Sequence, residues 1–332
     1  MLRTHTTSCI WSLSTKHFDN APTKEIMCVE SSQKTGFTST LNPDELRLVR
    51  TEDFFRTEQV IDFNTGGEVK GVIAVNTVNR YIVAVVKPYF DKPDMIFYVS
   101  LDGRNWHKAV FPEGADLHEK SFTIVKSPGP ALMVDVLGGG TTQFGSMYKS
   151  NSDGTFFAKV LENTNRNSMD YVDFERVQGV EGILIANVIA NPKEVELQRA
   201  NKEVQTRMSF DDGASWKEIK IVKDINGNNM RCNERVCSLH LHSVTSNHNY
   251  GQVSSAESAI GVMMGVGNYG SSLLEYDQCD TFLSDDYGLT WRMVREGAHK
   301  YEFGDQGTLL VIVDDEKDTD HIWWSKDRGE TW

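Results

Sequence analysis

The chain contains 332 residues, with 34 lysines and arginines against 47 aspartates and glutamates, so its formal net charge is −13. Such an acidic chain repels a phosphate backbone, which excludes nucleic-acid binding. The hydrophobic fraction of 39% is typical of a folded globular protein, and no apolar run reaches the roughly 18 residues of a membrane-spanning helix. The first residues also lack the apolar stretch of a secretory signal, so we expect either a cytosolic protein or a piece of a longer one.

One octet, with the pattern S-x-D-x-G-x-[ST]-W, recurs along the chain. It is nearly complete at 209–216, 284–291 and 325–332, shortened at 100–106 and worn at 150–157. A weaker copy at 51–58 keeps only Thr51, Asp53 and a late hydroxyl. The copies recur about every 55 residues, a period that indicates a repeat architecture.

Each part of the octet suits a tight turn between two strands. The Asp carboxylate accepts hydrogen bonds from backbone N–H groups ahead of it, the hydroxyl ties the other side, and Gly supplies a positive φ. Trp then begins the next strand and offers a large apolar face to the core. We predict structural Asp-box roles for Ser100, Asp102, Gly103, Trp106, Ser209, Asp211, Gly213, Trp216, Ser284, Asp286, Gly288, Trp291, Ser325, Asp327, Gly329 and Trp332.

The copy at 150–157 departs from the pattern. Ser152 stands at the Asp position and Phe157 at the Trp position. We therefore expect this turn to be the least well tied of the later copies.

Runs of β-branched and aromatic residues predict short strands throughout the chain. About four fall in each repeat, and no amphipathic helix is evident, although 42–50 could form a helical turn at most. In chain order, the clearest runs are 71–75, 81–86, 95–99, 182–189, 259–266, 281–283, 308–313 and 321–324.

Four short strands in each repeat are the signature of a propeller blade, so we predict an all-β fold, a β-propeller with Asp-box (BNR) repeats. The octets correspond to about six four-stranded blades. Because the last octet ends at Trp332, its following strand is missing, and we expect a piece of a larger ring.

The cysteine spacing leaves two interpretations open. Cys9 and Cys28 are 19 residues apart, Cys232 and Cys237 are 5 apart, and Cys279 stands alone. Two disulfide loops would fit an oxidising compartment, whereas unrelated buried thiols are the alternative. No second Cys or His pair completes a zinc site.

Two histidines and the aspartates of the octets could have either a functional or a structural role. His240 and His242 would share one face of a strand and could hold a metal together with Cys237 or His248, but we favour structural roles. The aspartates of the octets would lie on separate blades, too far apart for the paired carboxylates of a glycosidase. We therefore expect no catalytic residue, no metal and no cofactor.

Three loops are weaker candidates. Gly138, Gly139 and Gly140 lack the remainder of a phosphate-binding motif, and we interpret them as a flexible loop and a modest ligand-contact candidate. The charged stretches 192–199 and 314–320 are expected to be solvated loop tips. The acidic one lacks the residue order of a calcium-binding loop.

The octets are Asp boxes, which sialidases, other glycan-processing propellers and the sortilin family share. Further segments resemble the luminal domain of the sortilin family, in particular its fungal vacuolar protein sorting receptors of the carboxypeptidase Y sorting type. These segments are K-E-I-M-C-V-E at 24–30, Y-V-S-L-D-G-R-N-W at 98–106, C-S-L-H-L-H-S at 237–243 and G-V-M-M-G-V-G-N-Y-G-S at 261–271. The resemblance covers essentially all of the chain.

The resemblance implies that residues 1–332 are part of a ten-bladed luminal propeller, truncated at both ends. In the family, a signal peptide and further blades precede this region, and cysteine-rich modules, a membrane span and a sorting tail follow it. The resemblance also implies the disulfides Cys9–Cys28 and Cys232–Cys237, and it leaves Cys279 as a free thiol.

The implied function is binding rather than catalysis. The domain would bind soluble vacuolar hydrolase precursors in the lumen of the trans-Golgi network and endosomes, and contact a membrane only through segments that this chain lacks. Acidic release would need groups that titrate between about pH 5 and 7, for which histidine is suited. Family members grip a peptide carboxylate near the blade of the Ser150 copy, where Lys159 and Arg166 are the available cations, but no motif assigns either a role, so the ligand-binding residues are unknown.

The alternative is a sialidase-like glycoside hydrolase. Such enzymes share an early F-R-I-P or Y-R-I-P motif, which is absent here. Arg80, Arg207 and Arg292 also lack the context of the arginine triad that binds the substrate carboxylate.

Overall fold

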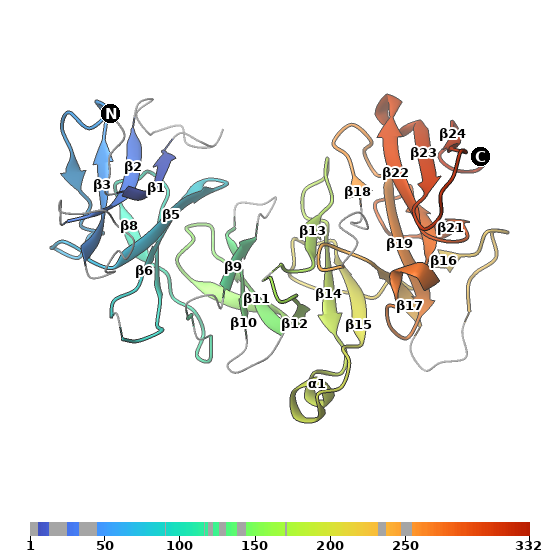
Figure 1. The fold of residues 1–332 in the computed structure, drawn as a ribbon, viewed down its shortest axis with the longest axis horizontal. Helices are drawn as coiled ribbons and strands as arrows, with labels where there is room; N and C mark the ends of the chain where they lie inside the picture. The colour runs from blue at the N-terminus through green and yellow to red at the C-terminus, as the bar shows by residue number, and fades with distance from the viewer. Residues whose placement is uncertain are drawn as a thin grey trace. The chain divides into compact units, whose positions relative to one another are not determined.

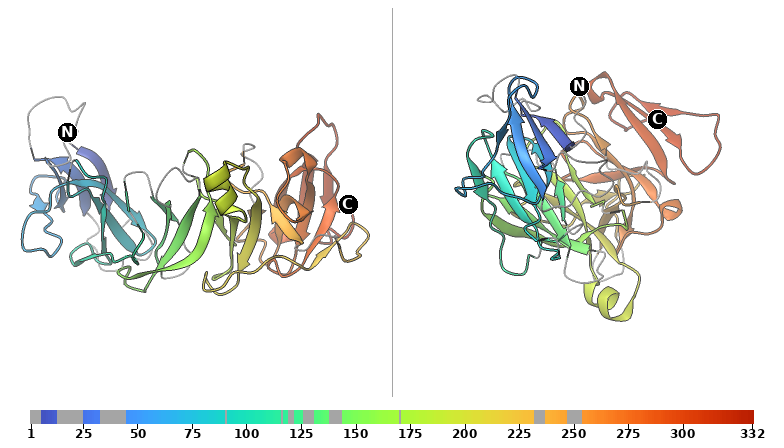
Figure 2. Two further views of the ribbon diagram at one scale, coloured as in Figure 1. Left: turned by 90° about the horizontal axis from the view of Figure 1, so that it is seen from below. Right: turned by 60° about the vertical axis from the view of Figure 1, so that its left-hand side comes forward.

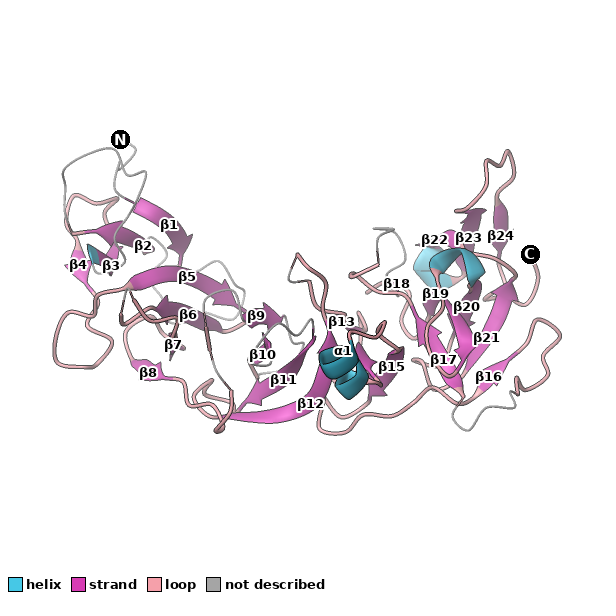
Figure 3. Cartoon of the chain, turned by 60° about the horizontal axis from the view of Figure 1, so that its bottom comes forward, coloured by secondary structure: helices cyan, strands magenta, loops and turns pink. Residues whose placement is uncertain are grey.

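The computed structural model describes residues 6–12, 25–32, 45–89, 91–115, 117–118, 122–125, 131–137, 144–169, 171–231, 237–246 and 254–332. The chain divides into two compact units, Met1–Gly138 with Tyr148–Lys159 and Gly139–Met147 with Val160–Trp332 (Figure 1). Strands dominate the regular structure of both units, so the expected all-β class is confirmed (Figure 3).

The first unit contains two four-stranded antiparallel sheets whose strands follow one another in chain order. Such up-and-down sheets are the building blocks of β-propellers. The first sheet consists of β1 (Thr6–Trp11), β2 (Ile26–Ser31), β3 (Leu46–Thr51) and β4 (Gln59–Val60). The second consists of β5 (Val72–Val78), β6 (Tyr81–Val86), β7 (Ile96–Ser100) and β8 (Trp106–Lys108).

A third set of strands follows. β9 (Phe122–Val125) pairs antiparallel with β10 (Met133–Leu137). β11 (Phe144–Ser150) and β12 (Phe157–Asn165) come next in the chain, and the division between the units falls within both of them.

The second unit is also built of sheets (Figure 2), and their pairs are antiparallel except for β16 with β21, which is parallel. β14 (Leu184–Ile189) pairs antiparallel with β13 (Phe174–Arg176) and β15 (Val204–Ser209). The next sheet has the order β16-β21-β20-β19-β17, with β18 also paired to β19, and the last has the order β22-β23-β24. The strands of these two sheets are β16 (Val222–Lys223), β17 (Ser238–Leu241), β18 (Ser254–Ser255), β19 (Met263–Gly270), β20 (Asp280–Ser284), β21 (Trp291–Arg295), β22 (His299–Gly304), β23 (Leu309–Asp314) and β24 (Trp323–Ser325).

The inner strands are buried on both faces, which explains their continuous apolar sequences. In β6, Ile82 and Ala84 belong to the core shared with the first sheet, whereas Tyr81 and Val83 belong to the core shared with β9 and β10. In β19, Met263 and Met264 likewise enter two different cores. The two-residue period of a strand therefore lets each small sheet pack against a neighbour on either side.

Two local expectations need correction. Residues 46–50 belong to β3 rather than to a helical turn, because Leu46 and Leu48 enter the core from a strand paired with β2. The charged stretch at 192–199 contains the short helix α1 (Pro192–Gln198), which begins with a proline near its N-terminus and buries no side chain. The other helices of the described residues are two 3-10 turns, Tyr276–Gln278 and Asp305–Gly307.

The disulfides agree with expectation as far as the described residues extend. Cys9 on β1 lies opposite Cys28 on β2, and the two are bonded. Cys237 is also disulfide-bonded, but its expected partner Cys232 lies outside the described residues. Cys279 is free and buried.

Candidate functional site

The octets occupy equivalent positions in their sheets. Each begins at the last residue of a strand: Thr51 in β3, Ser100 in β7, Ser150 in β11, Ser209 in β15, Ser284 in β20 and Ser325 in β24. The residue at the Trp position opens the following strand in β8, β12 and β21. The sequence repeat therefore marks one turn repeated along the chain.

The hydrogen bonds of this turn are clear in the copy at 209–216. The Ser209 hydroxyl donates to Oδ1 of Asp211 at 2.8 Å and accepts from the N–H of Gly213 at 2.8 Å. The Asp211 carboxylate then accepts from the N–H and the hydroxyl of Ser215, at 2.8 and 2.6 Å. The copies at 284–291 and 325–332 repeat these bonds at 2.5 to 2.9 Å.

The tryptophans close the turns. The indole N–H groups of Trp106, Trp291 and Trp332 donate to the carbonyls of Gly103, Gly288 and Gly329, at 3.3, 3.1 and 3.1 Å. The Trp216 indole N–H differs, because it finds no acceptor among the described residues.

The degenerate copies form similar turns with other residues. Asp53 accepts from the N–H and hydroxyl of Thr57, and Asp102 accepts from the N–H groups of Arg104 and Asn105. In the copy at 150–157, the acceptor is the Asn151 side chain, which receives the N–H groups of Thr155 and Phe156 at 2.8 and 3.2 Å. The expectation of a loosely tied turn is therefore wrong. The side-chain oxygen of Asn151 replaces the Asp carboxylate that is missing at Ser152.

The box carboxylates are suited to structure rather than to proton transfer. The Ser215 hydroxyl and N–H, together with Ser209, lower the pKa of Asp211 to about 2. The equivalent bonds from Thr331 and Ser325 also lower the pKa of Asp327. Both groups therefore stay ionised as acceptors at neutral pH.

The two histidines do not converge on one position. His240 accepts the N–H of Thr206 at Nδ1 (3.1 Å), and its Nε2 lies 3.0 Å from the carbonyl of Gly270. His242 lies with Nδ1 2.8 Å from the Ser246 hydroxyl and with Nε2 3.5 Å from the Cys279 thiol. Each imidazole is thus engaged at both nitrogens, and the described residues contain no group of three or more His, Cys, Asp or Glu side chains arranged to hold a metal. His248 lies outside the described residues.

His240 is also unsuited to sensing mild acid. Burial of the imidazole lowers its pKa to about 4, against the smaller raising effect of the Gly270 carbonyl. The side chain is therefore neutral between about pH 5 and 7, where acidic release was expected to use a histidine.

A buried polar network, not foreseen from the sequence, lies beside His240. The Asp173 carboxylate accepts from the side-chain amides of Asn165 and Asn187 at 2.8 and 3.1 Å, and from the hydroxyl and N–H of Thr245 at 2.7 and 2.8 Å. The Thr206 hydroxyl extends the network by donating to Asn187 at 2.7 Å. These hydrogen bonds satisfy the Asp173 carboxylate and join β12, β14 and β15 to the segment after β17.

The cations considered for ligand binding occupy different environments. Lys159 is exposed on β12, whereas Arg166 is only 1% exposed and offers no guanidinium at the surface. Lys202 donates to the Asn165 side chain at 3.0 Å and to the Arg166 carbonyl at 2.6 Å. Burial lowers the pKa of Lys202 to about 8, and the Asp173 carboxylate opposes this effect.

The two remaining loop candidates are the glycines at 138–140 and the acidic stretch at 314–320. Gly138, Gly139 and Gly140 lie outside the described residues. In the acidic stretch 314–320, Asp314 accepts the N–H groups of Glu316 and Lys317, and Asp315 pairs with Lys300 at 3.0 Å. These contacts form a turn in which the carboxylates of Asp314 and Asp315 bind N–H groups and a lysine of the protein itself.

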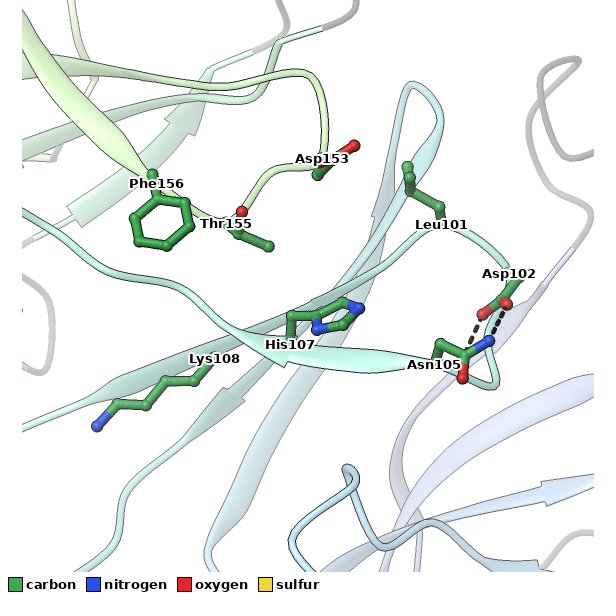
Figure 4. A pocket seen from close by; sticks show the side chains of 8 residues that line it. All are labelled: Leu101, Asp102, Asn105, His107, Lys108, Asp153, Thr155 and Phe156. Atoms are coloured by element: carbon green, nitrogen blue, oxygen red, sulfur yellow. Dashed lines mark hydrogen bonds between the residues drawn. The ribbon is translucent and has the colours of Figure 1, made fainter.

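A cavity of about 460 Å³ lies in the first unit between the outer strand β8 and the turn that follows β11. Its size is within the usual range of ligand pockets. Figure 4 shows that β8 and the segment before it contribute one wall and that the 153–156 turn contributes the other. The lining residues are Leu101, Asp102, Asn105, His107, Lys108, Asp153, Thr155 and Phe156.

No helix in the described part of the chain combines the length and apolar character needed to cross a bilayer.

These features define an all-β protein made of mainly antiparallel sheets with Asp-box turns. The family model described as "Sortilin, neurotensin receptor 3" matches residues 1–332, and the chain belongs to this Sortilin-Vps10 family. It is 41% identical over its full length to vacuolar protein sorting/targeting protein 10 of Laccaria bicolor and 38% identical to the Aspergillus flavus protein of the same name. The chain spans 23% and 22% of these two relatives. Among solved structures, the β-propeller domain of the Trilobed protease from Pyrococcus furiosus is similar at 11% identity and a TM-score of 0.34, covering 93% of this chain and 77% of that one.

Proposed function

We propose that this chain is a ligand-binding part of the luminal domain of a vacuolar sorting receptor. The 41% identity between the whole of this chain and part of a vacuolar protein sorting/targeting protein carries the proposal. The ligands would be soluble vacuolar hydrolase precursors, bound in the lumen of the trans-Golgi network and released in endosomes. Any attachment to a membrane would be made by other parts of the receptor.

The covalent chemistry supports a luminal location. The Cys9–Cys28 disulfide joins two adjacent strands, and Cys237 is disulfide-bonded as well. Disulfides persist in oxidising compartments and are reduced in the cytosol. A secretory-pathway lumen therefore suits this chain better than the cytosolic alternative that its N-terminal sequence left open.

The box carboxylates do not suit glycoside hydrolysis. A glycosidase needs one carboxyl group with a raised pKa as an acid and a second as a nucleophile or base. The carboxylates of Asp211 and Asp327 instead have lowered pKa values and are held by hydroxyl and N–H donors of their own turns. The sialidase-like alternative is therefore not favoured.

Complementation in a fungus that lacks its own receptor tests the proposal. The receptor gene is returned with the region homologous to this chain replaced by residues 1–332, and secretion of a soluble vacuolar hydrolase is measured. We expect the chimera to return most of the hydrolase to the vacuole. A chimera that reaches the Golgi at the normal level but leaves secretion as high as in the deletion strain would contradict the proposal.

A further inference from the structure

The outer strand β8 has a free edge that faces the cavity. β8 ends its sheet in the order β5-β6-β7-β8, so no described strand covers its other side. The N–H of Ala109 donates to the carbonyl of Phe97, which fixes the alternation along this strand. Hydrogen-bonding directions alternate along an antiparallel pair. The main-chain N–H and C=O of His107 therefore point to β7, where Val99 lies opposite, and those of Lys108 point away from the sheet.

The chain itself uses this edge two residues later. The N–H of Val110 donates to the carbonyl of Thr155 at 2.7 Å, and the Val110 carbonyl accepts the N–H of Phe157 at 2.9 Å. These bonds form a parallel bridge between Val110 and Phe156. Val110 and Lys108 are two residues apart, so their main-chain N–H and C=O groups point to the same side of the strand. At Val110 these groups are paired with the 155–157 segment, whereas at Lys108 they face the cavity of about 460 Å³.

The walls of the cavity combine apolar and polar groups. Phe156 lines the cavity and is 63% exposed, and Leu101 lines the opposite end of the cavity from Lys108 (Figure 4). Val110, which follows Lys108 by two residues and lies outside this lining, is 48% exposed. Large exposed apolar side chains beside an unpaired strand edge are a recurrent feature of peptide-binding surfaces. Polar groups on the same walls include Thr155 and Asp153.

We propose that this cavity binds an extended peptide segment of a partner protein, which pairs with the main chain of Lys108 at the free edge of β8 and places an apolar side chain against Phe156. Main-chain pairing supplies affinity in such strand addition, and the side-chain pocket supplies selectivity. The inference concerns an outer-strand surface and holds whether or not the chain sorts hydrolases.

Proline substitutions first test the edge itself. Lys108→Pro removes an N–H that faces the cavity, so the variant should unfold at nearly the same temperature as the wild type, because edge strands tolerate proline there. His107→Pro is the matched control: it removes an N–H that faces β7, and its melting temperature should fall clearly. Equal effects of the two prolines would show that the edge does not have this orientation, and would overturn the proposal.

Panning a phage-displayed library of random heptapeptides against the folded chain then tests binding. We expect enriched peptides with a central apolar residue, which lose at least tenfold in affinity for Lys108→Pro and for the exposed-site variant Phe156→Ser. Lys108→Gln retains the main-chain N–H and should bind as the wild type does. The proposal is overturned if no peptide is enriched, or if the enriched peptides bind both variants as tightly as the wild type.

Discussion

At the residue scale, Ser209 shows how one hydroxyl organises an Asp-box turn. It is 1% exposed, accepts the buried N–H of Gly213 and donates to Asp211. Ser209→Ala leaves that N–H without its acceptor, and an unsatisfied buried donor costs about 1–3 kcal/mol. We expect a loss of this size in the free energy of unfolding, measured with urea.

The matched control for this experiment is Ser152→Ala, in the worn copy. The Ser152 side chain is exposed, and the residue contributes its carbonyl to the Tyr81 hydroxyl at 2.8 Å. That bond survives the substitution, so stability should change by less than about 0.5 kcal/mol. Similar losses in both variants would mean that the Ser209 hydroxyl does not hold the turn.

His240 gives the fold a pH dependence. Burial holds its pKa at about 4 in the folded state, against an ordinary value of 6.5. The unfolded chain therefore binds more protons between these values, and stability falls as the pH drops from about 6.5 towards 4. One pKa unit corresponds to about 1.4 kcal/mol, so the wild type should lose about 2 kcal/mol of this contribution between pH 7 and pH 5.

The variant His240→Gln separates this effect from general acid sensitivity. A glutamine amide can donate to the Gly270 carbonyl in place of Nε2 but takes up no proton in this range. The variant should be less stable at pH 7 and should show a shallower decline towards pH 5. Parallel stability curves for the two proteins would assign the decline to other groups.

The sequence identifies some of these residues and misses others. The hydroxyl, carboxylate and glycine of the complete octets could be assigned turn positions because their spacing repeats. Asn151 could not, because it stands one residue before the position aligned with the Asp, and only the folded turn brings its amide to Thr155. The copy at Thr51 is also more complete than its sequence indicates. Asp53 and Thr57 make the hydrogen bonds of a complete box, and Phe55 has a positive φ of 63° at the position where the octet has glycine.

At the element scale, the box turns pack against a strand of the neighbouring repeat. Gly288 has a φ of +87°, and a Cβ added there would lie 2.4 Å from Cε and 2.9 Å from Sδ of Met208 on β15. Gly297 has a similar φ of +83°, but a Cβ there would meet no atom within 4 Å. The two glycines therefore separate the cost of a backbone conformation from the cost of a collision.

We expect Gly297→Ala to lose about 1 kcal/mol through its left-handed backbone alone. Gly288→Ala should lose a further 1–3 kcal/mol, roughly, because Met208 is in the core and must move. Thermal or urea unfolding of the two variants measures the difference. Equal losses would show that Met208 yields without cost and that the turn does not depend on close packing with β15.

Strands were more predictable than the contacts between them. The run at 81–86 coincides with β6, because a stretch of only six residues that is rich in β-branched side chains favours a strand over a helix. Asn187 on β14 and Thr206 on β15 belong to a buried network that the sequence pattern did not reveal. Their partners Asp173 and Leu241 were not predictable, since pairing across 14 and 35 residues follows from the arrangement of the strands.

At the scale of the whole molecule, each of the two units has apolar cores that its own sheets share. The first unit holds the core around Leu48, Ile82 and Trp106, and the second holds the core around Met208, Leu239 and Phe282. In repeat architectures of this kind, stability is approximately a sum of local contributions and nearest-neighbour interfaces. A perturbation at one end should therefore be felt mainly near that end.

The Cys9–Cys28 disulfide provides that local perturbation. It closes a loop with a sequence separation of 19, and a loop of this length contributes about 3 kcal/mol by restricting the unfolded chain. In the double variant Cys9→Ser, Cys28→Ser, hydrogen exchange followed by mass spectrometry should show faster exchange in β2 and β3, with β19 and β20 unchanged. The core of the second unit contains neither cysteine, so it has no direct reason to open. Faster exchange by the same factor in all four strands would instead show that the two units unfold as one cooperative body.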